Sequence, residues 1–213
     1  MHKIISISGR IGSGKDTVAD HLCSNYSFTR ISFADTLKDA ISAIFGWDRE
    51  LLSGVSKESR IWREQVDDWW AKRLDLPNLT PRWILQYWGT EVCRKGFHND
   101  IWVASLENRL RKIQQSVVIT DCRFPNEIQA VKNNNGLALR IERGTIPDWY
   151  NAAADYNRGP DGNIGWALGE STLRRLNIHP SEYASVGLKY DYVIDNNGTI
   201  QELHTRVDTI LKE

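Results

Sequence analysis

One glycine-rich segment constrains the fold more than any other part of the sequence. Residues 3–8 (KIISIS) form a short apolar run, and Gly9–Thr17 (GRIGSGKDT) follows it directly. Gly9, Gly14 and Lys15 match the pattern G-x-x-x-x-G-K, and a helical pattern begins after them. A strand, a glycine loop and a helix in this order predict a phosphate-binding loop, because backbone N–H groups and the helix N-terminus converge on an anion there. The ammonium group of Lys15 is then expected to reach the terminal phosphates of a nucleotide.

One position departs from the general form of this motif. A serine or threonine usually follows the lysine and holds Mg²⁺ through its hydroxyl, whereas this chain has Asp16 and then Thr17. A carboxylate can hold Mg²⁺ directly or through water, but it adds repulsion next to a triphosphate. We therefore expect Asp16 on the metal side of the site. The alternative is a carboxylate that only complements the helix dipole.

Strand and helix patterns alternate along the chain except in one long helical stretch. Apolar runs predict further strands at 28–33, 116–121, 137–143 and 190–195. Helical patterns occupy 34–46, 61–75, 80–97, 100–115, 124–136 and 199–213. Residues 47–60 look irregular. Gly46 is a predicted helix end, and Thr80 with Pro81 is a predicted helix start.

This alternation predicts an α/β fold with a parallel, three-layer sheet, in a single domain over residues 1–213. The stretch 34–115 is too long for one crossover, and we expect it to form an inserted helical lobe. Residues 144–180 are interrupted by glycine and proline, and we expect them to form a lid.

A second group of candidate residues follows the run at 116–121. Asp121 ends this run, and an acid at the carboxyl end of a parallel strand commonly orients Mg²⁺ or its water. Arg123 lies two residues further on, where a guanidinium can clamp a phosphoryl group with two hydrogen bonds. The alternative for Asp121 is a cap on the helix that begins near residue 125.

The helix expected over 81–94 carries side chains suited to a nucleotide. Arg82, Gln86, Tyr87 and Thr90 fall close to one of its faces, which brings charged, amide and aromatic groups together. An ordinary amphipathic helix with a solvated arginine explains the same spacing.

Three polar residues lie nearer the C-terminus. His179 belongs to the segment His-Pro-Ser-Glu before the last strand, and a lone histidine is more often structural. Arg140 and Arg143 flank the end of the strand at 137–143, where an arginine either stacks on adenine or lies exposed.

Composition narrows the class of protein. Lys+Arg and Asp+Glu both number 27, and zero net charge argues against stable nucleic-acid binding, which needs a basic surplus. No run approaches the roughly 18 apolar residues of a membrane span, so no membrane association is expected. The three cysteines lack metal-ligand spacing, which predicts reduced thiols in a cytoplasmic protein. Seven of the nine tryptophans lie in the stretch 34–115, where most are expected to pack the lobe.

Taken together, several motifs resemble those of the tailed-phage deoxynucleoside monophosphate kinases. They are GRIGSGKDTVADHL, LQYWGTEVCR followed by NDIWV, VVITDCRFPNE, and HPSE before a terminal YDYVIDNNGTI. The GKDT sequence is distinctive, since most loops of this type have GKS or GKT. The resemblance implies a P-loop fold like that of nucleoside monophosphate kinases, with a substrate-binding helical lobe and a lid. It also implies Mg²⁺-assisted transfer of the γ-phosphoryl group of ATP to a deoxynucleoside monophosphate.

The resemblance gives each segment a role. Lys15, Asp121 and Arg123 would act on the transferring phosphoryl group, and Asp16 and Asp121 would hold Mg²⁺. The residues implied in ATP binding are Gly9, Arg10, Gly12, Ser13, Gly14, Lys15, Asp16, Thr17 and Arg143. Those implied in acceptor binding are Arg82, Gln86, Trp88, Thr90, Glu91, Arg94, His179, Ser181 and Glu182. The implied partners are small-molecule nucleotides, and the sequence is compatible with a homodimer and, for a phage-encoded protein, with the host cytoplasm.

Two other functions are consistent with the same loop. One is a P-loop kinase with another acceptor, either dephospho-coenzyme A or a modified base in DNA, although zero net charge disfavours polymeric DNA. The other is a non-catalytic nucleotide-binding module, which would bind ATP without producing ADP.

Overall fold

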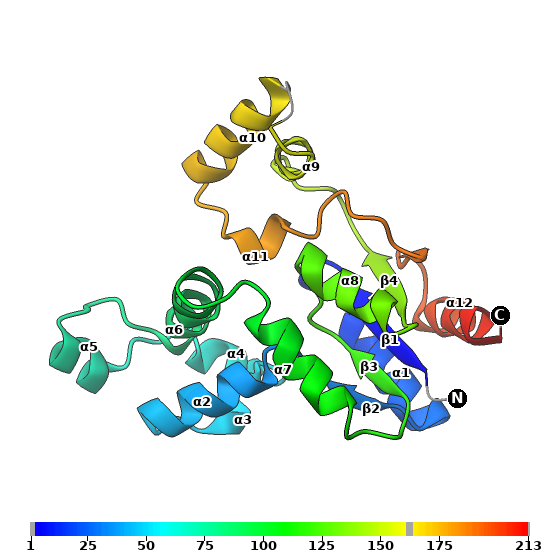
Figure 1. Cartoon of the computed structure of the whole chain (residues 1–213), viewed down its shortest axis with the longest axis horizontal. Helices are drawn as coiled ribbons and strands as arrows, with labels where there is room; N and C mark the ends of the chain where they lie inside the picture. Colours follow the sequence, from blue (N-terminus) through cyan, green and yellow to red (C-terminus); the bar gives the residue numbers. More distant parts are fainter. Residues whose placement is uncertain (1–2, 161–163, 213) are drawn as a thin grey trace. The chain divides into compact units, whose positions relative to one another are not determined.

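The computed structural model describes residues 3–160 and 164–212 and divides into two compact units. The sheet unit holds the residues up to Ser32 together with those from Ile113 onward, and the helical unit runs from Phe33 to Lys112. Figure 1 follows the chain through both units. The phosphate-loop motif and the segment around Asp121 therefore belong to the sheet unit, whereas the segment 81–94 belongs to the helical unit.

A five-stranded parallel sheet forms the centre of the sheet unit, which confirms the fold class predicted from the alternating pattern. Its strands are β1 (Ile4–Ser8), β2 (Thr29–Ile31), β3 (Val117–Ile119), β4 (Leu137–Glu142) and β5 (Tyr192–Asp195). Their order is β2-β3-β1-β4-β5, and all neighbouring pairs are parallel. In open parallel sheets, ligands bind beyond the carboxyl ends of the strands, at the point where the strand order reverses direction. In this sheet that place is the end of β1.

Helices cover the sheet as a three-layer arrangement requires. α1 (Lys15–Tyr26) and α12 (Ile200–Lys212) pack on one face, and α8 (Pro125–Asn133) lies against β1 and β4. All five residues of β1 are buried, because a central parallel strand is covered on both faces.

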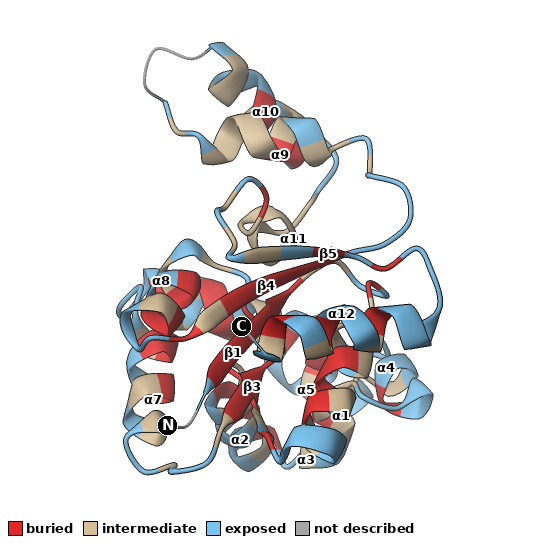
Figure 2. Ribbon diagram, turned by 90° about the vertical axis from the view of Figure 1, so that its right-hand side faces the viewer, coloured by how far each residue is buried: buried red, intermediate tan, exposed pale blue. Residues whose placement is uncertain are grey.

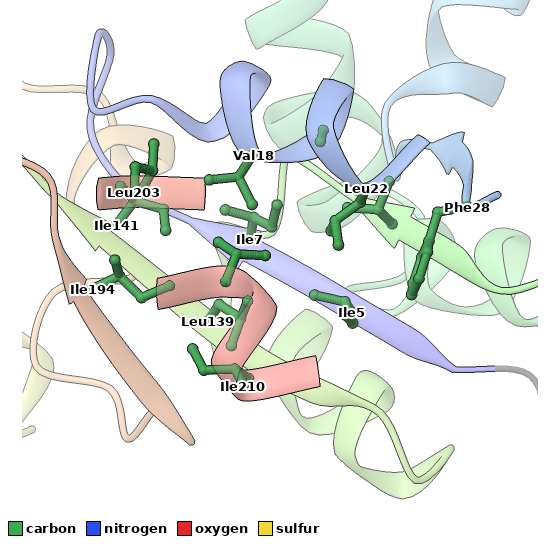
Figure 3. Packing of buried hydrophobic residues seen from close by; sticks show 13 residues of the cluster. Ile5, Ile7, Val18, Leu22, Phe28, Leu139, Ile141, Ile194, Leu203 and Ile210 are labelled. Carbon is green, nitrogen blue, oxygen red and sulfur yellow. The ribbon is translucent and has the colours of Figure 1, made fainter. Parts of the chain in front are cut away.

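The core on the α1 face fixes both ends of the phosphate-loop motif. Figure 3 shows Ile5 and Ile7 of β1 meeting Val18 and Leu22 of α1, with Leu203 of α12 beside them. None of these five side chains is more than 2% exposed. Because the strand before the loop and the helix after it share one close-packed core, the loop between them has little freedom to shift.

The segment 144–180 contains a packed pair of helices. They are α9 (Tyr150–Asn157) and α10 (Ile164–Arg175), and α11 (Pro180–Tyr183) follows them. A Cβ added at Gly169 would lie 2.4 Å from the carbonyl oxygen of Ala152, so the two helices cross at close range. Ala153, Leu173 and Val186 form a small separate core there, and Figure 2 shows the buried positions of both helices in red. The weak periodicity of this segment in the sequence did not predict these helices.

The helical unit corrects two expectations. It contains α2 (Asp35–Phe45), α3 (Arg49–Ser53), α4 (Lys57–Trp62), α5 (Asp68–Leu74), α6 (Pro81–Gln86), a π-helix η1 (Tyr87–Lys95) and α7 (Ile101–Leu110). The irregular structure expected over 47–60 is wrong, because Asp48 and Ser56 cap α3 and α4. The single helix expected over 61–75 is also wrong. The Asp67 carboxylate accepts a hydrogen bond from the Trp70 N–H at 3.0 Å and so starts α5 as a separate helix.

Tryptophans pack the interior of the helical unit. The Trp47 ring stacks on Phe45 with centroids 4.4 Å apart, and the Trp70 indole donates to the Phe45 carbonyl at 3.0 Å. The Trp47 indole donates to the Asp67 carboxylate at 2.7 Å, and Trp88 meets Phe45 edge-on. The indole N–H groups of Trp47 and Trp70 thus each have a partner, as expected for tryptophans that pack inside a unit.

No helix among the described residues is both long enough and apolar enough to cross a membrane.

Candidate active site

The phosphate loop, residues Gly9–Thr17, joins β1 to α1. Gly9 has φ +151°, and a Cβ there would lie 2.5 Å from both the Ile141 carbonyl oxygen and the Ser13 hydroxyl. Only glycine therefore fits at the start of the loop. The Ser13 N–H donates to the Arg10 carbonyl at 3.1 Å, which closes the turn, and the buried Ser13 hydroxyl has no hydrogen-bond partner among the described residues.

Lys15 begins α1 and folds back over the loop. Its Nζ donates to the carbonyl oxygens of Gly9 at 2.7 Å and Arg10 at 2.8 Å. Burial and the positive charge of Arg123 lower the pKa of Lys15 from 10.5 to about 8, against the opposing effects of Asp16 and Glu182. A half-buried cation with a lowered pKa at a helix N-terminus is poised to meet a negative ligand.

Asp121 lies just beyond the carboxyl end of β3, the strand next to β1. The β1–β3 register pairs Ser6 with Ile119, so Ser8 and Asp121 stand two residues further along the two strands. The Ser8 hydroxyl donates to the Cys122 carbonyl at 2.6 Å, and the Ser32 hydroxyl donates to the Asp121 carboxylate at 2.6 Å. The structure therefore places Asp121 at the same sheet edge as the phosphate loop.

Arg123 lies beside the histidine-containing segment predicted to bind the acceptor. Its guanidinium donates to the Ser181 hydroxyl at 3.5 Å and to the Glu182 carboxylate at 3.4 Å. His179 caps α11, because its Nδ1 accepts from the Ser181 N–H at 3.2 Å. The backbone N–H of Arg123 donates to the buried Glu127 carboxylate at 2.7 Å, which fixes the loop after β3.

These groups meet in one pocket of the sheet unit. Gly9, Lys15, Arg123, Ser181 and Glu182 all line it. Residues from the start, the middle and the last fifth of the chain are thus brought together. Arg10 and Arg140 also line the pocket, so four cationic residues and one carboxylate, Glu182, share it. Of the acceptor-binding candidates, the structure brings Ser181 and Glu182 next to Lys15 and Arg123.

Asp16 does not stand alone at the start of α1. Its carboxylate pairs with the guanidinium of Arg30 on β2, which also reaches Asp20 at 3.4 Å. Arg30 therefore offsets the negative charge that Asp16 brings next to the phosphate loop.

The other arginines near the loop have partners within the protein. Arg10 donates to the carbonyl oxygens of Thr145 at 2.6 Å and Arg143 at 2.7 Å, so it ties the loop to the connection after β4. Arg140 is only 5% exposed, so the alternative in which it lies exposed is wrong. Its guanidinium donates to Tyr150 Oη at 3.0 Å and lies 5.5 Å from the ring centroid of Tyr190.

The remaining acceptor-binding candidates lie in the helical unit, on α6 and η1. Thr90 and Arg94 are buried, and the Arg94 guanidinium donates to the Asn99 carbonyl at 3.1 Å. Glu91 pairs with Lys95 at 2.9 Å. The Arg94 guanidinium therefore has a partner inside the unit, whereas Glu91 pairs with a lysine one turn further along the same helix.

The outer face of α6 and η1 is more open. Arg82 lies 3.3 Å from Glu64, Gln86 is half-buried, and the exposed rings of Trp83 and Tyr87 stack with centroids 5.1 Å apart. π-Helical turns such as η1 are frequent at functional sites. The Trp102 indole donates at 2.9 Å to the Gly89 carbonyl within it.

The donor set fits Mg²⁺ only together with a nucleotide. Mg²⁺ usually keeps several waters and is bound by one or two carboxylates plus substrate phosphates. Among the described residues, no group of three or more His, Cys, Asp or Glu side chains could hold a metal ion by itself. Asp121 and Asp16, next to a phosphate loop, match the substrate-assisted kind of site.

Sequence reasoning missed three residues around the loop. Arg30 and Ser32 come from β2 and its carboxyl end, and Asn196 follows β5 and donates to the Ser13 carbonyl at 2.8 Å. A signal existed for Ser32, since polar residues at the carboxyl ends of parallel strands gather at one sheet edge. Asn196 stands in an Asn-Asn-Gly turn, where the turn itself explains the asparagine.

A parallel sheet, a G-x-x-x-x-G-K loop after its central strand, and a lysine and an arginine in one pocket define a phosphotransferase of the P-loop kinase class. No family model matches the chain. It is 30% identical over 217 aligned positions to a putative deoxynucleotide monophosphate kinase of Acanthamoeba polyphaga mimivirus, which covers 96% of this chain and 93% of the relative. The chain therefore belongs to the deoxynucleoside monophosphate kinase family.

Two further likenesses accompany this one. The deoxynucleoside-5'-monophosphate kinase of Escherichia phage T5 is 30% identical over 188 aligned positions, which cover 65% of this chain and 75% of that protein. Among solved structures, the dephospho-CoA kinase from Campylobacter jejuni is 16% identical with a TM-score of 0.42, over 99% of this chain and 96% of that one.

Proposed function

We propose that the protein transfers the γ-phosphoryl group of ATP to a deoxynucleoside 5'-monophosphate and releases ADP and the deoxynucleoside diphosphate. The observation that carries this proposal is the pocket in which Lys15, Arg123 and the phosphate loop come together beside Ser181 and Glu182. The family and the names of both viral relatives support the same acceptor class.

The proposed reaction is an in-line displacement at the γ-phosphorus. An oxygen of the acceptor phosphate forms the new P–O bond while the bond to the oxygen bridging the β- and γ-phosphorus atoms breaks. The acceptor phosphate is already anionic, so the step needs no strong general base. Catalysis then comes from alignment and from charge stabilisation by Lys15 and Arg123.

The other candidate residues take supporting roles in this proposal. The N–H groups of the phosphate loop and of the first turn of α1 would hold the donor phosphates. Asp121 and Asp16 would hold Mg²⁺, which neutralises charge on the phosphates when bound. Residues of α6 and η1 would belong to the acceptor-binding lobe, and α9 and α10 to a lid whose closure excludes water.

A coupled assay of ADP release tests the proposal across acceptors. We expect turnover with one or more of dAMP, dGMP, dCMP and dTMP. The turnover rates with the deoxyribose and ribose forms of the same base should differ measurably. Parallel reactions contain dephospho-coenzyme A, or duplex DNA at several salt concentrations. If ADP is released with dephospho-coenzyme A or duplex DNA but with none of the deoxynucleotides, the protein is a kinase for that other acceptor. Tight ATP binding with no ADP release in any reaction would indicate a non-catalytic module.

The lowered pKa of Lys15 predicts proton uptake on ATP binding. With a pKa of about 8, Lys15 is charged at neutral pH and neutral well above pH 8. The negative phosphates of ATP raise this pKa again, so binding at about pH 9 should take up roughly 0.9 proton, while binding near pH 7 takes up almost none. ATP affinity should therefore fall as the pH rises above about 8.

Calorimetric titrations in two buffers of different ionisation enthalpy measure this uptake directly. The matched control is Lys15→Arg, whose guanidinium stays protonated throughout this range. Equal proton uptake by the wild type and Lys15→Arg near pH 9 would show that another group titrates.

A further inference from the structure

Asn196 is a buried polar residue that reaches the phosphate loop from the far end of the chain. It directly follows β5 and is 7% exposed. Its Nδ2 donates to the Ser13 carbonyl oxygen at 2.8 Å, and its backbone N–H donates to the Glu142 carbonyl oxygen at 2.7 Å. The side-chain amide therefore links the sheet edge at β5 to the loop between β1 and α1.

The bond falls on a peptide group whose orientation decides what the loop can bind. The Ser13 C=O and the Gly14 N–H belong to one trans peptide, in which these two groups point in opposite directions. A phosphate loop binds an anion by turning its N–H groups inward. Holding the Ser13 oxygen outward, on the Asn196 amide, therefore holds the Gly14 N–H toward the phosphate side.

The conformation of Gly14 gives this peptide a particular need for such a constraint. Gly14 caps α1 with φ +103° and ψ +13°, a left-handed conformation that only glycine adopts at little cost. The same freedom makes a flip of the Ser13–Gly14 peptide inexpensive, and a flipped peptide would present a carbonyl oxygen to the phosphates. A fixed donor on the Ser13 oxygen opposes that flip.

The side chain of Asn196 packs directly against Gly14 and leaves no room for a larger residue there. A Cβ added at Gly14 would lie 2.4 Å from Asn196 Nδ2, so the amide rests directly against the glycine Cα. The turn that carries the amide is itself held in place. The Glu202 carboxylate accepts from the Thr199 N–H at 2.7 Å, and the backbone N–H of Asn196 is bonded to the Glu142 carbonyl oxygen.

We propose that Asn196 is a positioning residue for phosphoryl transfer, which holds the Ser13–Gly14 peptide in the orientation that binds the donor phosphates. The proposal rests on the proposed role of the loop as the ATP-phosphate site. Asn196 touches neither substrate and acts through the Gly14 N–H.

Two substitutions at Asn196 and one at its neighbour test the proposal. Asn196→Ala removes the donor without adding charge, and Asn196→Asp keeps the volume but places an acceptor against the Ser13 oxygen. The matched control is Asn197→Ala, which removes an exposed bond of the same turn that does not reach the loop. Calorimetry measures binding of ATP and of inorganic tripolyphosphate, which carries the phosphates without the base. Steady-state kinetics separates the KM for ATP from the KM for the acceptor.

We expect both Asn196 variants to bind ATP and tripolyphosphate at least about tenfold more weakly, the scale for one lost hydrogen bond to a charged group. The KM for the acceptor should stay within about twofold, and Asn197→Ala should match the wild type. In an amide NMR spectrum, the Gly14 signal should shift on adding tripolyphosphate to the wild type and stay in place in Asn196→Ala.

Two results would overturn the proposal. One is wild-type affinity for tripolyphosphate in a folded Asn196→Ala protein. The other is a parallel loss of affinity for ATP and acceptor together with a lowered Tm, which indicates a general structural role. If Asn196→Ala does not fold, the isosteric Asn196→Asp decides by the same criteria. Failure of the proposed function can be told apart from failure of this proposal. If the wild type binds tripolyphosphate but has no kinase activity, the proposed function fails, while the binding comparison between the wild type and the Asn196 variants can still be made.

Discussion

Replacing Lys15 with alanine should lower kcat for phosphoryl transfer by at least about a hundredfold, the scale for losing one key electrostatic donor in an active site. The Lys15 ammonium lies over the phosphate loop on the Gly9 and Arg10 carbonyl oxygens, and it lines the same pocket as Arg123. Steady-state ADP release with the best acceptor measures the effect.

Stability should not fall with activity in this variant. Burial and Arg123 lower the pKa of Lys15, which means that keeping its charge costs the folded state free energy at neutral pH. Between about pH 8 and 10.5 the unfolded chain holds this proton more tightly than the folded one, so the free energy of unfolding rises with pH there. Lys15→Ala removes that cost, and its Tm at pH 7 should equal or exceed that of the wild type.

Lys57 provides the matched control. It is likewise the first residue of a helix, but it is exposed and belongs to the helical unit rather than to the phosphate loop. Lys57→Ala should keep wild-type kcat. Near-normal turnover by a folded Lys15→Ala protein would remove Lys15 from the mechanism.

The sequence predicted those parts of the fold that depend on local pattern. A central parallel strand must be apolar on both faces, which is why the runs around Ile5 and Val118 were recognisable as strands. Helix ends that carry a capping residue could also be predicted from the sequence. Thr80 caps α6 through a 3.1 Å bond from the Trp83 N–H, and Gly46 ends α2 with φ +70°, both as predicted.

What the sequence could not show depends on pairs of residues far apart in the chain. Arg140 has an ordinary strand position, and only the fold places Tyr150 and Tyr190 around its guanidinium. The same is true of Asn196, whose partner Ser13 lies at the other end of the chain. The ion pair between Asp16 and Arg30 of β2 is likewise invisible in the local sequence.

In the candidate site, too, the sequence predicted the features set by local pattern but not the contacts between distant residues. Spacing identified the phosphate loop, and the apolar run before Asp121 located the second acid. Spacing did not show that Ser181 and Glu182 stand next to Arg123, which requires the connection from β3 and the segment before β5 to meet. In the structure, the two separate motifs line one pocket. The positive charge of Arg123 also helps to lower the pKa of Lys15.

That shared environment gives the second large prediction. Arg123→Ala should lower kcat by about a hundredfold to a thousandfold, since an arginine facing a transferring phosphoryl group contributes at least that much. Arg123→Lys should recover little, because an ammonium cannot form the two parallel hydrogen bonds of a guanidinium. Either substitution keeps the backbone N–H that bonds to Glu127, so the loop after β3 should stay in place.

A second readout separates a role in the pocket from a role in folding. The charge of Arg123 helps to lower the pKa of Lys15, so its removal should raise that pKa toward the ordinary value. Proton uptake on ATP binding near pH 9 should then be smaller in Arg123→Ala than in the wild type. The control is Arg73→Ala, an exposed arginine in the last turn of α5 that has no part in the pocket. Unchanged kcat together with unchanged proton uptake in Arg123→Ala would contradict the view that Lys15 and Arg123 act on one ligand.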